Sequence, residues 1–157
     1  MRVGTGFDAH PFVDGRPLRL GGIVIPYPKG LAGHSDGDAL LHAIADALLG
    51  AAGRGSLGEH FPDGSDEWRG ADSAVLLGRA SAMVSEAGFR LGNVDAVVIG
   101  EAPKIAPHAA DIRTRVAEIL GVPPNRVSVR GSSANGLGFT GRGEGLAALA
   151  VALLEER

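Results

Sequence analysis

The sequence predicts an α+β protein, a two-layer sandwich in which a mixed β-sheet carries helices on one face. Two observations support this fold class. Apolar residues recur at helical spacing in several segments, and β-branched runs between those segments indicate strands. The strands and helices do not alternate strictly as β-α-β units, which favours the α+β class. The 157 residues are expected to form a single domain, 1–157, large enough to bury one core.

The N-terminal third is predicted to contain a strand, a second extended segment and a helix. Arg2–His10 indicates a strand, and Asp14-Gly15 indicates a turn after it. The extended segment is Leu18–Tyr27, and Gly21-Gly22 interrupts it. Asp38–Gly50 is predicted to be a helix because apolar residues recur at i, i+3, i+4 and i+7. These apolar residues are Leu41, Ile44, Ala45 and Leu48.

The rest of the chain is predicted to add three helices and two strands. The helices are expected at Ala71–Ala87, Pro107–Leu120 and Gly143–Glu156, and the strands at Val94–Gly100 and Val127–Ser133. The last helix differs from the others because Leu146–Leu154 is apolar on every side. A helix of this kind is normally buried all round. We therefore expect it to be covered either within its own domain or by another subunit.

Composition and charge exclude several classes of function. The net charge of -3 argues against a general nucleic-acid-binding protein, which usually carries a basic face. The longest apolar stretch is too short to span a bilayer, and the N-terminal segment lacks the apolar core of a signal peptide. No cysteine is present, so a disulfide framework is excluded. We expect a cytoplasmic protein that contacts no membrane and no nucleic acid.

One carboxylate and two imidazoles form the strongest candidate site. Asp8 and His10 are two residues apart on the first predicted strand, so their side chains leave the same face. His42 lies on the first predicted helix. Catalytic zinc sites commonly use three such ligands and keep a fourth position open, whereas structural sites usually add a fourth ligand, often cysteine. The alternative for each histidine is an ordinary core or surface position.

Further polar residues extend this candidate site. Asp46 shares a helix face with His42 and is predicted to accept a hydrogen bond from the ring nitrogen that faces away from the metal. Asp38 is expected to act at the helix N-terminus. Ser35 could serve as a cap or as a ligand contact. His34 is better explained by a phosphate or substrate contact, because helix N-termini attract anions.

A segment rich in glycine and hydroxyl residues, 131–145, follows the last predicted strand. Loops of this composition let backbone N–H groups approach phosphates closely. Glycine-rich loops are common, so this feature alone is a weak signal. Arg142 and Glu144 within the segment could form a surface ion pair of little energetic value.

Taken together, these motifs give the chain a resemblance to the 2-C-methyl-D-erythritol 2,4-cyclodiphosphate synthases. The resemblance covers essentially the whole chain at the spacing of that family. The motifs are Asp8-Ala9-His10, His34-Ser35-Asp36-Gly37-Asp38 with His42, Phe61-Pro62-Asp63, Ala102-Pro103-Lys104 and the segment from Leu137 to Gly145.

The resemblance implies a phosphorus–oxygen lyase of the non-mevalonate isoprenoid pathway, assembled as a homotrimer with active sites between subunits. The enzyme would convert 4-diphosphocytidyl-2-C-methyl-D-erythritol 2-phosphate to the 2,4-cyclodiphosphate and CMP. The 2-phosphate would attack the β-phosphorus, a reaction that needs alignment and charge neutralisation more than a strong base. Zn²⁺ would be held by Asp8, His10 and His42, and Mg²⁺ or Mn²⁺ would be a second ion.

The resemblance also implies roles for further residues. His34 and Ser133 would be catalytic by stabilising the transition state; the family usually has threonine at position 133. The substrate-binding residues would be Asp8, Ala9, His10, His34 and Ser35; Ser56, Leu57 and Gly58 at the ribose; Phe61, Pro62, Asp63, Gly64 and Ser65 at the methylerythritol phosphate; Gly100, Glu101, Ala102, Pro103, Lys104, Ile105 and Ala106 at the cytosine; and Ser132, Ser133, Ala134 and Asn135 at the diphosphate. Phe139 and Arg142 would line a central cavity of the trimer that can hold an isoprenoid diphosphate.

Two positions depart from the pattern of that family. Position 56 is usually aspartate, and Ser56 is a weaker acceptor for ribose hydroxyls. Position 135 is usually acidic and ligates the second ion, whereas Asn135 offers an uncharged amide oxygen to cations that favour carboxylates. Two alternatives therefore stay open. One is a divergent protein that binds a nucleotide or an isoprenoid diphosphate without efficient cyclisation, and the other is a zinc-dependent phosphohydrolase.

Overall fold

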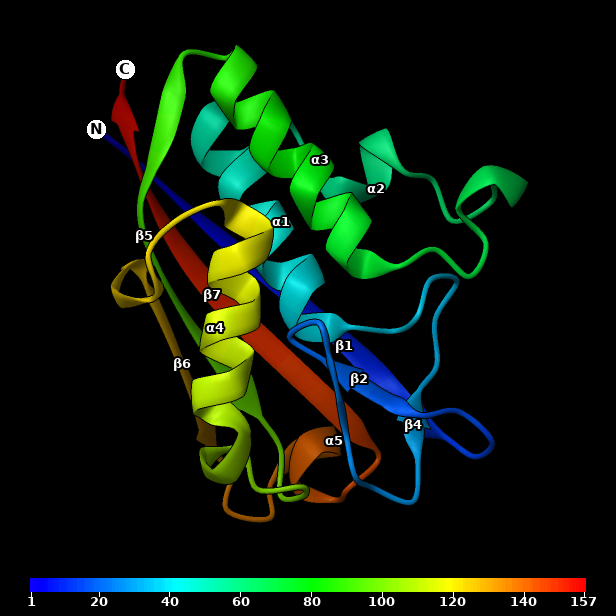
Figure 1. Cartoon of the computed structure of the whole chain (residues 1–157). Helices are drawn as coiled ribbons and strands as arrows, with labels where there is room; N and C mark the ends of the chain where they lie inside the picture. The colour runs from blue at the N-terminus through cyan, green and yellow to red at the C-terminus, as the bar shows by residue number, and fades with distance from the viewer.

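A computed structural model describes residues 1–157 and shows a mixed β-sheet with helices against one face (Figure 1). β1, β7 and β5 are antiparallel neighbours in the middle of the sheet, and β6 runs parallel to β5 at one edge. This arrangement confirms the predicted α+β class and the mixed sheet. In sheet order, the strands are β4 (Gly30–Leu31), β1 (Arg2–Val13), β7 (Gly145–Glu156), β5 (Phe89–Ile99) and β6 (Val127–Ser132).

Three helices form the second layer. α1 (Ala39–Ala52) packs against β1 and β7, α3 (Ser73–Glu86) packs beside α1, and α4 (Ala109–Leu120) covers β6 (Figure 1). None of the helices combines the length and the continuous apolar sequence that a bilayer span requires. The shorter elements are the hairpin strands β2 (Leu18–Leu20) and β3 (Ile23–Ile25), the single helical turns α2 (Leu57–His60) and α5 (Gly138–Gly141), and 3₁₀ turns at Asp66–Trp68, Ala106–His108 and Pro124–Arg126.

Most predicted elements are confirmed, with ends that shift by a few residues. The first strand continues past His10 to Val13, and the strand predicted from Val94 begins at Phe89. The extended segment Leu18–Tyr27 is a hairpin that turns at Gly21 and Gly22, both of which have positive φ. This conformation is readily available to glycine, which explains the interruption in the apolar run.

The last element is a strand where the sequence predicts a helix. Gly145–Glu156 is β7, which lies between β1 and β5, so the predicted helix Gly143–Glu156 is wrong. Alanine and leucine have high helix propensity, but pairing on both edges overrides this local preference. The sheet lies close to α1 at the neighbouring strand β1, where a Cβ atom at Gly4 or Gly6 would lie 2.1 or 1.9 Å from a backbone oxygen of α1.

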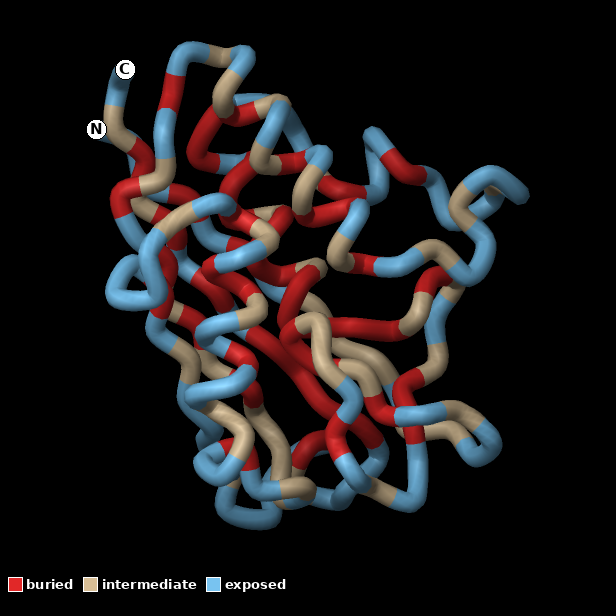
Figure 2. The backbone as a smooth tube through the Cα atoms, in the orientation of Figure 1, coloured by how far each residue is buried: buried red, intermediate tan, exposed pale blue.

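The main core lies between α1 and the sheet. The predicted apolar stripe of this helix is confirmed, since Leu41, Ile44, Ala45 and Leu48 are all buried. Figure 2 shows the continuous buried region formed by α1 and the central strands. The alternate residues of β7 that face this core, such as Ala148 and Ala150, are fully buried. Their small size lets the helix and the sheet approach closely.

The opposite face of the sheet carries exposed apolar side chains. Val3 and Phe7 of β1 are 65% and 56% exposed, and Leu149 and Val151 of β7 are 40% and 39% exposed. Phe7 is the register partner of Leu149, so these residues form one patch across two strands. The run that is apolar on every side is therefore a strand with one face in its own core. Contiguous exposed apolar patches of this kind are typical of protein contact surfaces.

Candidate metal centre and adjoining cavities

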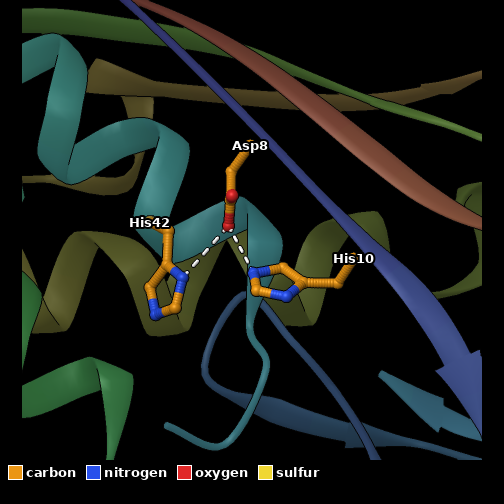
Figure 3. A group of neighbouring side chains, drawn as sticks. All are labelled: Asp8, His10 and His42. Carbon is orange, nitrogen blue, oxygen red and sulfur yellow. Dashed lines mark hydrogen bonds and ion pairs between the residues drawn. The ribbon is translucent and has the colours of Figure 1, made fainter. Parts of the chain in front are cut away.

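β1 and the first turn of α1 bring the three candidate metal ligands together. Asp8 and His10 leave β1 on the face that contacts α1, as their spacing predicts. His42 projects toward them from α1 (Figure 3). α1 begins at Ala39, one turn before His42. Asp38 caps it, because its side chain accepts a hydrogen bond from the backbone N–H of Leu41 at 3.0 Å, and this confirms the predicted role of Asp38 at the helix N-terminus.

The ligand atoms of this triad already converge on one point. Oδ2 of Asp8 lies 2.7 Å from Nε2 of His10 and 3.0 Å from Nδ1 of His42. Because a carboxylate can only accept hydrogen bonds, each of these nitrogens donates to it. The three candidate ligand atoms lie within 4.8 Å of one another. One carboxylate oxygen and two imidazole nitrogens so placed fit a divalent metal ion.

The charges of the triad are coupled. Burial alone raises the pKa of Asp8, but the hydrogen bonds from His10 and His42 outweigh it and lower this pKa to about 2. The hydrogen bond to Asp8 raises the pKa of His10, and burial opposes this effect. In the absence of metal, the Asp8 carboxylate therefore favours the protonated form of His10. A metal ion that binds here replaces this proton.

The second ring nitrogen of His42 has different partners from the predicted one. Nε2 of His42 lies 2.8 Å from Oγ of Ser73 and 3.1 Å from Oγ of Ser35, and the Ser73 hydroxyl donates to Oδ1 of Asp36. The predicted hydrogen bond from His42 to Asp46 is wrong, because Asp46 accepts instead from the backbone N–H of Leu57 at 2.6 Å. This bond fastens α2 to α1. Nothing in the local sequence around Ser73 points to residue 42, so only the tertiary structure reveals the pair.

The loop before α1 is held in place from two sides. The guanidinium of Arg16 donates to the carbonyl oxygens of Gly33 and Ser35 at 3.1 and 2.6 Å. These contacts flank His34, whose Nε2 lies 2.9 Å from the carbonyl oxygen of Ser65. The Ser35 hydroxyl accepts from the N–H of Gly37 at 3.3 Å, so it shapes this loop while Asp38 caps the helix. Arg16 lies outside every motif of the sequence, so only the fold reveals this contact.

Asp38 connects this loop to the β2–β3 hairpin. Its carboxylate accepts from the backbone N–H groups of Gly21 and Gly22 at 2.9 and 2.7 Å, in addition to Leu41. The side chain is completely buried, and this burial raises the pKa of Asp38. Three backbone donors on one carboxylate compensate for much of the cost of burying the charge.

A cavity of about 490 Å³ adjoins the triad. Phe61 and Trp68 lie at its wall, with ring centroids 4.9 Å apart in an edge-on arrangement. Trp68 and Leu76 were not predicted, whereas Ala9 leaves β1 on the opposite face from Asp8 and does not line the cavity. Ser56, Pro62 and Gly64 are neighbours of lining residues in the chain, and the carbonyl oxygen of Ser65 contacts the lining residue His34. The lining residues are Asp8, His10, Pro11, Ala32, Gly33, His34, Ser35, His42, Asp46, Leu57, Gly58, Phe61, Asp63, Trp68 and Leu76.

A second cavity, of about 150 Å³, lies where the parallel strands β5 and β6 end. Loops at the carboxyl ends of parallel strands are common ligand sites. Of the residues predicted near a cytosine and a diphosphate, Glu101, Ala102, Ala134 and Asn135 do not line it. Strand β7 separates β5 from β1 and the triad. The lining residues are Gly100, Pro103, Lys104, Ile105, Ala106, Gly131, Ser132 and Ser133.

Phe139 and Arg142 line neither cavity. Phe139 lies in the short helix α5 and is exposed. Arg142 donates to Glu144 at 2.9 Å, which confirms the predicted surface ion pair. The pair raises the pKa of Arg142 and lowers the pKa of Glu144.

Comparison with known proteins places the chain in a family. The sequence model of the YgbB family matches residues 1–155. The chain belongs to the YgbB family. A relative from Marinobacter nauticus, named 2-C-methyl-D-erythritol 2,4-cyclodiphosphate synthase, is 55% identical over 155 residues, which are 99% of this chain and 98% of that protein. The family assignment therefore covers both cavities and all three members of the triad.

Solved structures show the same fold. The bifunctional IspDF of Campylobacter jejuni matches with a TM-score of 0.96 and 40% identity over 99% of this chain and 42% of that longer chain. A 2-C-methyl-D-erythritol 2,4-cyclodiphosphate synthase in a CDP-bound form matches with a TM-score of 0.90 and 38% identity over 98% of this chain and 100% of its own. These two proteins therefore share both the fold and a substantial part of the sequence with this chain.

Proposed function

We propose that the protein converts 4-diphosphocytidyl-2-C-methyl-D-erythritol 2-phosphate to 2-C-methyl-D-erythritol 2,4-cyclodiphosphate and CMP, a step of isoprenoid biosynthesis by the non-mevalonate route. One observation carries this proposal: the Asp8, His10 and His42 triad opens on a 490 Å³ cavity in a chain that is 55% identical to a synthase of this name. In the reaction, an oxygen of the 2-phosphate bonds to the β-phosphorus. The bond from that phosphorus to the oxygen of CMP breaks, and CMP leaves with the electron pair.

The metal of this proposal is Zn²⁺, held by Oδ2 of Asp8, Nε2 of His10 and Nδ1 of His42. When bound, Zn²⁺ polarises a phosphate oxygen and offsets charge at the reacting phosphorus. The contact between Ser73 and Nε2 of His42 orients the ring so that Nδ1 meets the metal. Because the nucleophile is already an anion, the protein need not supply a strong base. Alignment of the two phosphates accounts for most of its task.

His34 and Ser133 are the proposed stabilisers of the transition state. Nε2 of His34 is engaged with the carbonyl oxygen of Ser65, which leaves Nδ1 for a ligand in the large cavity. Ser35 and residues 61–65 would contact the methylerythritol phosphate, and Ser56 with Leu57 and Gly58 the ribose. Donors that are aimed at developing phosphate charge before the reaction begins lower its barrier.

A homotrimer would combine the two cavities into one active site. Within a single chain, β7 separates the loops of the 150 Å³ cavity from the triad. A substrate that carries a cytosine at one end and a phosphate at the other fits a site shared by two subunits. The exposed apolar patch of Val3, Phe7, Leu149 and Val151 supports such packing. Phe139 and Arg142 would then face the threefold axis, where an isoprenoid diphosphate can bind.

The second divalent ion, Mg²⁺ or Mn²⁺, is proposed to lie near Asn135 on the diphosphate. An amide oxygen can coordinate such an ion, although it adds no charge. The cytosine would enter the 150 Å³ cavity, where backbone groups of residues 100–106 can contact its edge. This proposal locates the ribose and the metal-bound phosphates between the two cavities.

Product analysis by phosphorus NMR tests the proposed function. The purified protein is incubated with Zn²⁺, Mg²⁺ and the CDP-methylerythritol phosphate substrate, and we expect a cyclic diphosphate together with CMP. A linear product with CMP would instead indicate a phosphohydrolase in which water replaces the internal nucleophile. Unconverted substrate that binds to the metal-loaded protein would indicate a divergent binding protein. A Glu118→Gln variant, altered on the exposed face of α4, serves as the matched active control.

A further inference from the structure

We propose that Glu101 is a positioning residue that fastens the loop of Ser133 and Asn135 to the loop that forms the 150 Å³ cavity. Through this contact, a base bound in the cavity would also order the loop that holds the diphosphate. The identity of the base as a cytosine rests on the proposed function, whereas the contact itself does not.

The side chain of Glu101 turns away from the cavity that its neighbours line. Its Oε1 accepts hydrogen bonds from the backbone N–H groups of Ala134 and Gly136, at 3.0 and 3.4 Å. The two donors lie on either side of Asn135 in the chain. One carboxylate oxygen therefore brackets the residue proposed to meet the second metal ion, although Glu101 itself lines neither cavity.

Apart from Glu101, backbone contacts hold this loop, such as the hydrogen bond from the N–H of Leu137 to the carbonyl oxygen of Ala134 at 3.0 Å. None of the residues 132–137 is buried, so side-chain packing contributes little to its shape. Asn135 has a φ of 54° and Gly136 a φ of 76°, which are left-handed conformations. Asparagine is one of the few residues besides glycine that adopts this conformation readily, which gives a backbone reason for Asn135. The Ser133 hydroxyl bonds within the loop, to the N–H of Asn135 at 3.3 Å.

The two loops also meet along the strand ends. The backbone N–H of Gly100 donates to the carbonyl oxygen of Ser132 at 3.0 Å, continuing the contact between β5 and β6. A Cβ atom at Gly131 would lie 2.9 Å from Ile105, so the loops are in close contact there as well. The cavity is lined from both sides, by Pro103 and Lys104 in one loop and Ser133 in the other. A ligand that fills the cavity touches both loops. Outside the cavity, Glu101 joins the same two loops through its hydrogen bonds to Ala134 and Gly136.

The first experiment tests the contact without any ligand. Amide hydrogen exchange is measured by NMR in the full-length protein and in Glu101→Ala, with Glu118→Ala as the control for loss of an exposed carboxylate. In Glu101→Ala, the amides of Ala134 and Gly136 should exchange about tenfold faster or more, as expected for loss of a charge-assisted hydrogen bond. Glu101→Gln keeps an acceptor oxygen and should restore slow exchange. A merely destabilised fold would instead accelerate exchange throughout the sheet.

The second experiment tests the coupling with CDP as the probe. In the wild-type protein, CDP should slow exchange at Ala134 and Gly136. In Glu101→Ala, it should still bind but leave both amides fast, kcat should fall, and the Kd of CDP should rise by no more than the factor by which CDP slows this exchange in the wild type. Unchanged exchange in ligand-free Glu101→Ala would overturn the positioning role, and equal protection by CDP in both proteins would overturn the coupling.

The two experiments keep the proposals separate. If wild-type protein does not bind CDP at all, the proposed function fails, while exchange in the ligand-free protein still decides whether Glu101 positions the loop. Should Glu101→Ala not fold, Glu101→Asp provides the second variant. Its carboxylate is one methylene shorter and should give the same local acceleration at Ala134 and Gly136.

Discussion

The cavity beside the triad and the cavity at the ends of β5 and β6 are built by different means. The 490 Å³ cavity takes its chemistry from side chains on regular elements, with Asp8 and His10 on β1 and His42 on α1. The 150 Å³ cavity is formed where β5 and β6 end, and the loops that follow them, with two glycines and an alanine in its wall, supply most of its lining. A metal centre needs particular donor atoms, and a base pocket needs a shape with backbone polar groups at its edge. Substitutions should therefore affect the first cavity far more than the second.

The largest effect is expected at the metal triad. His42→Ala should abolish zinc retention and lower activity by more than the ~10–100-fold that loss of a partner outside the ligand set costs. The reason is that two remaining ligands cannot hold the ion against water. Metal analysis of the purified variant and a rate measurement check this expectation, while circular dichroism verifies that the variant is folded. Full zinc occupancy in this variant would contradict the triad assignment.

The second largest effect on zinc binding is expected from Ser73, whose hydroxyl contacts His42. Ser73→Ala removes the group 2.8 Å from Nε2 of His42 and should weaken zinc binding about 10–100-fold. Competition with a chelator measures the affinity. Ser81→Ala, on the same helix, has no contact with the triad and serves as the control. Equal affinities in the two variants would show that Ser73 does not orient the ring.

The coupled charges of Asp8 and His10 should make the stability of the metal-free fold depend on pH, an effect of intermediate size. The raised pKa of His10 means that its pairing with Asp8 stabilises the metal-free fold fully below pH 6.5, and that this contribution is lost as the pH rises through the raised value. The Asp8 carboxylate, with its pKa lowered from 3.8 to about 2, contributes above pH 3.8 and is lost as the pH falls through about 2. In a chelator, the Tm should therefore fall as the pH rises above 6.5.

Zinc should remove the fall in Tm above pH 6.5, because the ion takes the place of the proton on His10. Its apparent affinity should rise with pH by up to about tenfold per unit while that proton is being displaced. Thermal melts with zinc and with chelator, repeated on His10→Gln, measure both parts. A pH slope that persists unchanged in His10→Gln would assign it to another group.

A smaller effect is expected where the loop meets the second ion. Asn135→Glu should tighten the Mg²⁺ or Mn²⁺ dependence and raise the rate, because a carboxylate adds the charge that these ions favour. The gain is limited by the left-handed backbone at this position, which costs a residue other than glycine or asparagine about 1–2 kcal/mol. Metal titrations of the rate check this expectation. An identical titration in both proteins would mean that position 135 contacts no metal.

The smallest effect is expected in the loop-built cavity. Lys104→Ala should change the Kd of CDP by less than about threefold, because truncating an exposed lysine removes little where backbone groups are proposed to recognise the base. Calorimetric titration with CDP measures this directly. A large loss of affinity would show that the second cavity also depends on a side-chain contact, and the contrast between the two cavities would disappear.

The triad and most of the elements around it can be predicted from local patterns in the sequence. Two residues apart on a strand, Asp8 and His10 must share a face, and the apolar spacing after Asp38 must bury one side of α1. Such periodicities are local, so they survive in a sequence without any knowledge of the fold. The resemblance of the motifs supplied the rest of the candidate site.

Which distant segments meet depends on the folding of the whole chain. Gly145–Glu156 is a strand because β1 and β5 pair with its two edges, although its composition favours a helix. Several contacts of the site join residues that are not neighbours in the chain. They are the contacts of Ser73 with His42, of Leu57 with Asp46, and of Glu101 with the loop at Asn135. Local sequence sets which face a side chain occupies. The burial of the whole chain sets what that face meets.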